Sequence, residues 1–286
     1  MTGRVVVGVD ESEGSSAALR WAAREAELRN TTVLAVLAWS YLDQHPGAGG
    51  FDPAFTSDDA AAALDARVTA ALPAERARLV HRHVVCDLPA RALLEASAGQ
   101  EMLVIGARGL GGFTGLLVGS VSQHCLHAAT VPTVVVRNLH DHPGSGSIVA
   151  GVDGSDDSGR ALAWAVDEAR RRGCPLTVVH GYELPLRSHL SPRFSPEAMA
   201  AAAAALVDTM TRGVDGAGLD VTTTTSPTGP AQALIDASRD ADLLVVGSRG
   251  RGAVRRLLLG SVATQVVHHA PCTVAVIPNH ASNPPA

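Results

Sequence analysis

The sequence is poor in aromatic residues, with two Tyr, three Trp and four Phe among its 286 residues. Proteins that bind single-stranded nucleic acids stack bases on aromatic side chains, so the composition argues against this class. Positive charge is also scarce, because 23 basic residues stand against 28 acidic ones and the net charge is −5. A general DNA or RNA binder needs a basic face, and we expect no nucleic-acid partner.

Long hydrophobic runs are absent too, because no stretch approaches the roughly 20 apolar residues that a membrane-spanning helix needs. The first residues reach acidic and turn residues after a short apolar run, so we expect no signal peptide. Four widely spaced cysteines form no CxxC pair, namely Cys86, Cys125, Cys174 and Cys272. We expect them to be buried, reduced thiols, and the chain to be cytoplasmic with no membrane partner.

The sequence does contain 46 % hydrophobic residues, enough to bury a sizeable core. It also contains an internal duplication. Residues 5–39 align without gaps on residues 148–182, so that Asp10 corresponds to Asp153. Residues 88–109 align in the same way on residues 229–250. Two long ungapped blocks in the same order indicate a tandem repeat.

Each copy has the length of a domain. We therefore expect a first domain at residues 1–140 and a second at residues 147–286. The segment 137–147 between them is rich in Pro, Gly and Ser, as is typical of a short exposed linker.

Within a copy, short apolar runs alternate with segments of helical periodicity. In the first copy we expect strands at 5–9, 32–39, 79–85, 102–105 and 133–136, and helices at 15–29, 58–78, 89–98 and 119–128. Ser15 or Ser16 is the expected N-cap of the first helix. Strict alternation of strands and helices predicts an α/β fold of two tandem, doubly wound, parallel five-stranded sheets of Rossmann-like type.

Ligands of such sheets bind beyond the carboxyl ends of the strands. The first strand ends in Gly8, Val9 and Asp10, a motif repeated as Gly151, Val152 and Asp153. A carboxylate at this place can accept hydrogen bonds from the two hydroxyls of a ribose. The alternative, which these residues alone leave open, is that the aspartate caps the following helix.

The fourth strand leads into Gly106-Ala-Arg108-Gly109, followed after nine residues by Gly119-Ser120. The second copy has Gly247-Ser-Arg249-Gly250 and Gly260-Ser261 at the same spacing. Glycines allow a tight turn close to a ligand, and a helix that begins with Gly-Ser presents N–H groups to an anion. The repeated spacing favours a phosphate-binding loop over a simple turn and cap. At the end of the second strand, the small residues Ala38 and Gly181 predict room for a flat base.

The pattern GVDxS after the first strand, with G-x₂-G-x₉-G-S after the fourth, resembles the ATP-binding branch of the universal stress protein family. The resemblance spans nearly the whole chain as two tandem domains, related to the adenine nucleotide alpha hydrolase-like folds. It implies one ATP for each domain, accompanied by Mg²⁺ as is usual for a triphosphate. It also implies ribose contacts for Asp10 and Asp153 and an adenine pocket beside Gly8, Val9, Ala38 and Gly181.

The resemblance further assigns the phosphates to the two glycine turns and to the residues that begin the following helix. These candidate ATP-binding residues are Gly106, Arg108, Gly109, Gly119, Ser120, Val121 and Ser122, and Gly247, Arg249, Gly250, Gly260, Ser261, Val262 and Ala263. Ser122 is replaced by Ala263 in the second copy, so one hydroxyl contact is expected to be missing there.

The nine-residue loops differ in charge. The first has no charged residue, whereas the second contains Arg251, Arg255 and Arg256. Cationic side chains near a triphosphate predict tighter ATP binding, or a steeper dependence on salt, at the second site. The alternative is that these arginines form a solvated helix face.

The chain has no Walker motif, no Lys in either loop and no G-x-S-x-G nucleophile motif. We therefore expect a nucleotide-dependent regulator of the stress response, without catalytic residues. The alternatives are a slow ATPase or autophosphorylating phosphotransferase, with Ser120 or Ser261 near the phosphates, and a scaffold with vestigial sites. The histidines, among them His81 and His83, lack carboxylates or cysteines at ligand spacing, so we expect no metal bound by side chains.

Strands 133–136 and 273–277 are expected to pair the two domains with each other. A homodimer and a regulatory protein partner are the further partners that the resemblance leaves open.

Overall fold

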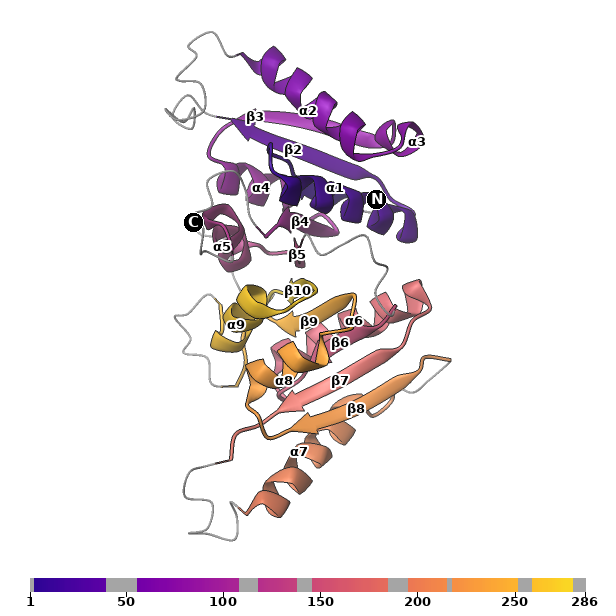
Figure 1. Cartoon of the computed structure of the whole chain (residues 1–286), viewed down its shortest axis with the longest axis vertical. Coiled ribbons are helices and arrows are strands. Elements are labelled where there is room, and N and C mark those ends of the chain that lie inside the picture. The colour runs from indigo at the N-terminus through magenta and orange to yellow at the C-terminus, as the bar shows by residue number, and fades with distance from the viewer. Residues whose placement is uncertain are drawn as a thin grey trace. The chain divides into compact units, whose positions relative to one another are not determined.

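The structure, a computed structural model, describes residues 3–39, 56–107, 118–137, 146–184, 195–214, 218–251 and 259–279. The chain divides into two compact units, Met1–Asn138 and Leu139–Ala286 (Figure 1). Within these described ranges, no helix is long and apolar enough to cross a membrane. Each unit is an α/β layer structure, as the alternating sequence pattern predicts.

In unit 1 the strands lie in the order β3-β2-β1-β4-β5, and all the pairings between neighbours are parallel. The elements are β1 (Val5–Gly8), α1 (Glu13–Leu28), β2 (Val33–Trp39), α2 (Ser57–Ala71), α3 (Ala74–Ala77), β3 (Val80–Cys86), α4 (Pro89–Ser97), β4 (Met102–Gly106), α5 (Ser120–Ala128) and β5 (Thr133–Val136). The sheet is doubly wound, because the strand order reverses between β1 and β4.

Unit 2 repeats this topology in the order β8-β7-β6-β9-β10, again with parallel pairings throughout. Its elements are β6 (Ile148–Gly151), α6 (Asp156–Arg172), β7 (Leu176–Gly181), α7 (Pro196–Thr211), β8 (Val221–Ser226), α8 (Pro230–Ala237), β9 (Leu243–Gly247), α9 (Ser261–His269) and β10 (Thr273–Ile277). The two copies in the sequence thus give the same fold twice. The predicted pairing of the two domains through β5 and β10 stays a prediction.

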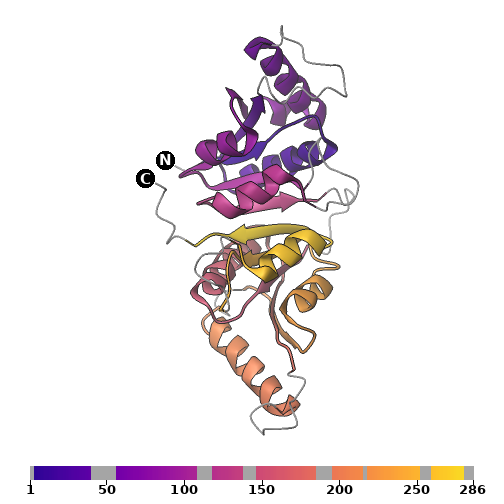
Figure 2. The ribbon, with the colours of Figure 1, turned by 90° about the vertical axis from the view of Figure 1, so that its left-hand side faces the viewer.

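Helices cover both faces of each sheet (Figures 1 and 2). In unit 1, α1 and α2 pack against each other and on one face, while α4 and α5 pack on the other. Strands covered on both sides must be apolar throughout, and the residues Val5, Val6 and Val7 of β1 are fully buried. In unit 2, α6 and α7 correspond to the first pair of helices and α8 and α9 to the second.

The first helix begins earlier than the sequence analysis predicts, and this prediction of its cap is wrong. Ser12, rather than Ser15 or Ser16, is the N-cap of α1, and its side chain accepts a hydrogen bond from the Ser15 N–H at 3.1 Å. The reason lies in the preceding turn, because the Asp10 carboxylate holds Ser12 in place. Ser155 caps α6 in the same manner.

The helix predicted at 58–78 is also interrupted. The chain leaves α2 at Leu72 in an extended conformation, and Pro73 then precedes the short α3. A proline disfavours the helical conformation of the residue before it, which explains the break at Leu72. At the other end of α2, Thr56 and Asp59 form a reciprocal capping box that fixes where the helix begins.

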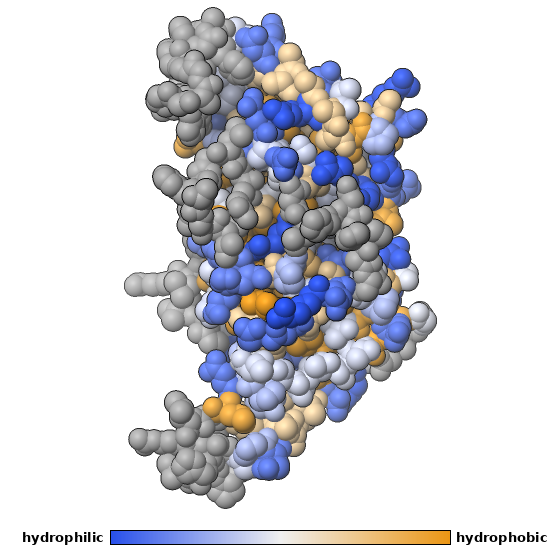
Figure 3. Space-filling view, viewed as in Figure 1, coloured by the Kyte–Doolittle hydropathy of each residue, from blue (hydrophilic) through white to orange (hydrophobic). Residues whose placement is uncertain are grey.

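The surface of the described residues has few large apolar side chains. Those that are exposed are Leu28, Leu79, Leu88 and Leu184. In the view of Figure 3, hydrophobic areas are small and separated by hydrophilic ones. Most apolar side chains of the described residues are therefore buried in the cores of the two units.

Candidate functional site

The reversal of strand order places β1 beside β4 in unit 1 and β6 beside β9 in unit 2. Loops leave the carboxyl ends of such neighbouring strands toward opposite faces, and the crevice between them is where doubly wound sheets bind ligands. β1 ends at Gly8 and β4 ends at Gly106. The described starts of the two predicted motifs, Gly8 and Gly106, therefore lie at the ends of neighbouring strands.

In unit 1 the strand-end aspartate organises the turn into α1. Asp10 Oδ1 accepts hydrogen bonds from both the backbone N–H, at 2.9 Å, and the hydroxyl of Ser12. Ser15 donates its hydroxyl to the Asp10 carbonyl at 2.8 Å. Asp10 thus supports the cap residue and is not itself the N-cap, which answers the alternative left open by the sequence.

In unit 2 the corresponding carboxylate has a further partner. Asp153 Oδ1 accepts from the Ser155 N–H at 3.0 Å and from the Ser155 hydroxyl. Asp153 Oδ2 accepts from the backbone N–H of Arg251 at 2.8 Å, across 98 residues of sequence. The turn that follows β6 and the loop that follows β9 are therefore in direct contact.

These contacts shift the titration of Asp153. Burial by itself raises the pKa of this carboxyl, but hydrogen bonds outweigh it. The donors are the Ser155 hydroxyl and N–H and the Arg251 N–H, and together they hold the pKa below its usual value. Asp153 is therefore an ionised acceptor at neutral pH.

Helices α5 and α9 begin without a side-chain cap. Their N-caps, Gly119 and Gly260, have no side chain that accepts a hydrogen bond from the first turn. Each N-cap N–H is itself bound, to Ala107 O in unit 1 and to Ser248 O in unit 2, both at 2.8 Å. Among the described residues, no N-cap side chain accepts from the N–H groups of the first helical turn, which is the arrangement that an anion at a helix N-terminus requires.

This geometry gives the residues of the first turn a main-chain role. Ser120, Val121 and Ser122, and in unit 2 Ser261, Val262 and Ala263, all contribute backbone N–H groups. The side chain of Ser122 is only 5 % exposed, and its hydroxyl donates to Gly106 O at 2.8 Å. The exchange of Ser122 for Ala263 therefore removes an internal bond of the turn and leaves the backbone N–H groups of the first helical turn unchanged.

Arg249 is the described arginine of the two glycine turns, and it is held against α6. Its Nε lies 3.9 Å from Asp157 Oδ2, which also accepts a hydrogen bond from the Ser248 hydroxyl at 3.4 Å. Asp157 forms a second ion pair with Arg160. The counterpart arginine Arg108, together with Gly109, lies outside the described residues.

Sequence reasoning missed this polar cluster of Asp157, Arg160, Ser248 and Arg249. A signal was present, because the first copy has Gly14, Ala17 and Ala107 where the second has Asp157, Arg160 and Ser248. Charged residues gained together in one copy at positions near the motif indicate a shared contact. The cluster is thus a property of unit 2 by sequence.

The strand-end glycines allow helices to approach closely. A Cβ on Gly106 would lie 2.7 Å from the carbonyl carbon of Gly14, and one on Gly247 would lie 2.9 Å from that of Asp157. Real Cβ atoms do not approach backbone so closely. Glycine at these positions brings the first turn of α1 or α6 against the end of the fourth strand.

The adenine side of the site is less open than the sequence suggests. A Cβ on Gly181 would lie 2.6 Å from Cα of Pro230 and 2.7 Å from Gly229 O, so α8 fills that space. Ala38 is half-buried at the same place in β2. Val9 and Val152 are buried, and each extends its strand by donating its N–H, at 2.9 Å, to Val36 O and Val179 O respectively.

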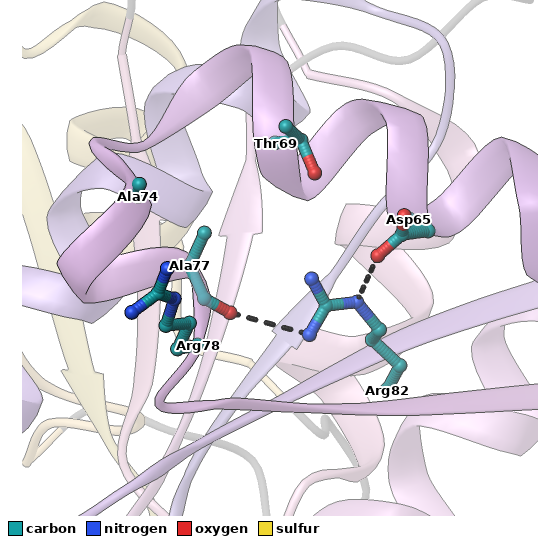
Figure 4. A pocket seen from close by; sticks show the side chains of 6 residues that line it. All are labelled: Asp65, Thr69, Ala74, Ala77, Arg78 and Arg82. Carbon is teal, nitrogen blue, oxygen red and sulfur yellow. Dashed lines mark hydrogen bonds and ion pairs between the residues drawn. The ribbon is translucent and has the colours of Figure 1, made fainter.

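A separate pocket of about 460 Å³ lies at the start of β3 in unit 1 (Figure 4). It is lined by Asp65, Thr69, Ala74, Ala77, Arg78 and Arg82. Arg82 points toward Asp65, with Nε 2.8 Å from Oδ1, and also donates to the carbonyls of Ala77 and Val80. Its position at the amino end of the strand excludes it from the crevice described above.

Among the residues that the structure describes, no group of three or more His, Cys, Asp or Glu side chains is close enough together to hold a metal ion. His81 and His83 are exposed on β3, the edge strand of unit 1.

Comparison with known proteins gives consistent relatives. A model of the universal stress protein family matches residues 1–137 and 145–278. Universal stress protein Rv2623 of Mycobacterium tuberculosis is 31 % identical over 286 residues, covering 95 % of each chain. Universal stress protein Rv2005c of the same species is 33 % identical over 288 residues, covering 95 % of this chain and 96 % of the relative.

Among solved structures, a universal stress protein from Archaeoglobus fulgidus matches with a TM-score of 0.67 at 20 % identity. The match covers 96 % of this chain and 98 % of the other. At this identity the likeness shows the fold alone.

Proposed function

The chain belongs to the universal stress protein family, and we propose that it binds ATP, one molecule in each unit, as a nucleotide-dependent regulator of the stress response. The observation that carries the proposal is the hydrogen bond between Arg251 N–H and Asp153 Oδ2. It joins a carboxylate suited to ribose hydroxyls to a loop suited to phosphates, at the crevice where this fold binds ligands.

Each part of the nucleotide has a counterpart in the proposed site. The carboxylates of Asp10 and Asp153 accept from the ribose. The phosphates lie against the uncapped N–H groups at the start of α5 and α9, with the positive end of the helix dipole behind them. The adenine lies beside Val9 and Ala38 in unit 1, and beside Val152 in unit 2, where α8 rather than the base packs on Gly181.

The chain contains no lysine, so the cationic contacts to the phosphates fall to arginine. In unit 2, Arg249 is positioned by Asp157, and the exposed Arg251 follows it in the loop. Mg²⁺ bound to the triphosphate would complete the neutralisation of charge. The glycine turns keep the backbone close enough for these groups to converge.

The engagement of the carboxylates supports a binder over an efficient enzyme. Asp10 and Asp153 hold the serine caps of α1 and α6, and Asp157 is buried between Arg160 and Arg249. A general base must lie within hydrogen-bond distance of the attacking water, and it needs an unoccupied acceptor position to take the proton of that water. These described carboxylates are committed to structure instead.

The test silences one site at a time. Gly119 and Gly260 have extended backbone conformations, φ −75°, ψ 160° and φ −74°, ψ 156°, which valine adopts readily. In Gly119→Val or Gly260→Val, the isopropyl group covers the first N–H groups of one helix. Calorimetric titration with Mg-ATP is expected to give two sites for the unsubstituted chain, one for each single variant and none for the double variant.

A matched control is Gly159→Ala, because this glycine lies on α6, where an added Cβ would meet only Met210 Cε, at 3.9 Å. It should retain both sites. Circular dichroism checks that every variant is folded. An unsubstituted chain that binds no ATP at millimolar concentration contradicts the proposal, and release of phosphate at many equivalents per minute favours the enzymatic alternative.

A further inference from the structure

The carboxylate of Asp153 has few acceptor positions left for a ligand. An ionised carboxylate offers about four lone-pair positions, two on each oxygen. Oδ1 accepts from both the N–H and the hydroxyl of Ser155. Oδ2 accepts from the N–H of Arg251 at 2.8 Å. Among the donors that the structure describes, none takes the second position on Oδ2, so one acceptor position stays available in unit 2.

The loop lies tightly against this second oxygen. A Cβ on Gly250 would be 2.5 Å from Asp153 Oδ2, so the backbone of the loop covers one side of it. The neighbouring serine does not compete, because the Ser158 hydroxyl donates to Ser155 O at 2.9 Å. The loop rather than the turn thus decides how much of Oδ2 a ligand can reach.

The side chain of Arg251 reinforces the contact. Gly154 has a left-handed backbone, φ +77°, and a Cβ there would lie 2.8 Å from Nη2 and 3.1 Å from Cζ of Arg251. The guanidinium therefore packs on the aspartate turn itself. The first copy has Glu11 and Leu110 at these two positions, so this side-chain contact is restricted to unit 2 by sequence.

A ribose presents two neighbouring hydroxyls, at the 2′ and 3′ carbons, whereas Asp153 can accept one more hydrogen bond. We propose that unit 2 recognises a single ribose hydroxyl, so that one of the two monodeoxy analogues of ATP binds as tightly as ATP itself. Gly250 and Arg251 are then residues that determine specificity. This inference rests on the proposed binding of ATP and adds the class of sugar that the site accepts.

The experiment uses the full chain with Gly119→Val, so that only unit 2 binds. Calorimetric titrations compare ATP, 2′-deoxy-ATP and 3′-deoxy-ATP. Loss of a hydrogen bond to a charged group weakens binding by about tenfold or more. We expect one analogue to bind within about threefold of ATP and the other to bind about tenfold or more weakly.

A second variant tests the cause. Gly250 is not among the described glycines with positive φ, so Gly250→Ala introduces a Cβ without backbone strain. This Cβ displaces the loop from Asp153 Oδ2 and frees a second acceptor position. In Gly119→Val/Gly250→Ala, both deoxy analogues are expected to bind about tenfold more weakly than ATP. Gly119→Val/Gly159→Ala, with the same added methyl outside the site, should keep the tolerance for one analogue.

The outcomes separate this inference from the proposed function. If ATP binds to unit 2 and both analogues lose about tenfold, or neither loses affinity, the single-hydroxyl inference is overturned while ATP binding stands. A Gly250→Ala chain that keeps its tolerance overturns the role of the loop. Absence of binding by all three nucleotides overturns the proposed function and this inference together.

Discussion

Glu25 and Arg29 form an ion pair within unit 1 in which the two side chains are only 0 % and 8 % exposed. Arg29 also lies 3.7 Å from Glu101, the residue before β4. The pair therefore links the C-terminal end of α1 to the start of β4. This contact lies at the amino ends of the strands, whereas the candidate site lies at their carboxyl ends. Unit 2 repeats it with Glu168 and Arg172, at 0 % and 21 % exposure.

Arg29→Met is expected to destabilise unit 1 strongly. Removing one member of a buried ion pair leaves the other charge in a poorly solvated place, at a typical cost of about 3 kcal/mol. Urea unfolding followed by hydrogen exchange of α1 peptides measures the loss. Arg172→Met should cost less in unit 2, because Arg172 is more exposed than Arg29.

The matched control is the double variant Glu25→Gln/Arg29→Met. It removes both charges, so it should recover much of the stability that Arg29→Met loses. If the double variant is as unstable as the single one, packing of the arginine stem rather than the ion pair holds α1 in place.

Arg251→Gln tests the ranking of the two nucleotide sites. Arg251 is the described cation of the unit 2 loop and is exposed, and glutamine replaces it with a shorter, polar and uncharged side chain. We expect weaker ATP binding to unit 2 and a shallower dependence of its affinity on salt, because a positive charge near the phosphates is lost. Titrations in the Gly119→Val and Gly260→Val backgrounds measure each site by itself. Unit 1 should be unaffected, and equal salt dependence of unit 2 with and without Arg251 would place this cation on a solvated helix face.

Ser122→Ala should loosen the Gly106 turn. The hydroxyl of Ser122 donates to Gly106 O in a buried setting, and removing it leaves that carbonyl without this donor. The expected cost is about 1 kcal/mol for unit 1. Hydrogen exchange resolved by peptide measures it at β4 and α5. Ala263→Ser is the reverse change in unit 2, where the new hydroxyl is expected to bond to Gly247 O, and exposed Ser120→Ala should leave stability unchanged.

Most of the fold follows from local patterns in the sequence. Apolar runs such as Val5–Gly8 form the strands that are buried on both faces, and helical periodicity places the helices between them. The duplication then repeats the result. The errors are local as well, since Ser12 rather than Ser15 caps α1 and Pro73 divides the helix predicted at 58–78. In both errors, a single residue at a turn, Ser12 or Pro73, sets the helix boundary against the longer periodic pattern.

The site is less predictable, because its contacts join distant segments. The motifs identify Asp153 and Gly250, but the bond from Arg251 N–H to Asp153 spans 98 residues and involves a backbone group that no side-chain pattern reveals. The approach of α8 to Gly181 is likewise a packing contact. A small residue predicts close approach, but the sequence does not say whether a helix or a base is the neighbour.

Unit 2 should lose stability in acid through Asp153. Hydrogen bonds hold its pKa in the folded chain below the ordinary value of 3.8. A lowered pKa stabilises the folded state fully above the ordinary value, and this contribution disappears as the pH falls through the lowered one. A carbon-13 NMR titration of the carboxyl should show a midpoint below 3.8.

Asp153→Asn isolates this contribution. Its urea midpoint should lie below that of the unsubstituted chain at pH 7, and the gap should narrow once the pH is below the lowered pKa. Asp236→Asn, at an exposed carboxylate of unit 2, gives the comparison for a residue outside the site. A gap that stays constant with pH would show that the carboxylate is not bound in the folded chain.

The four thiols should differ in reactivity in the order of their exposure. Cys86 is exposed, so the prediction that all four cysteines are buried is wrong for this residue. Cys174 is half-buried with its pKa raised by burial, and Cys125 is buried with its pKa raised to about 12. Cys272 is also buried, and its Sγ donates to Thr273 O at 3.4 Å. Because the thiolate is the reactive form, a thiol reagent at pH 8 is expected to label Cys86 rapidly and Cys174 slowly. Cys125 and Cys272 should react only after unfolding in guanidinium chloride. The Cys86→Ser variant should lose only the rapid phase of labelling. If fewer than four thiols react in the chain unfolded without reductant, a disulfide is present where the sequence predicts reduced cysteines.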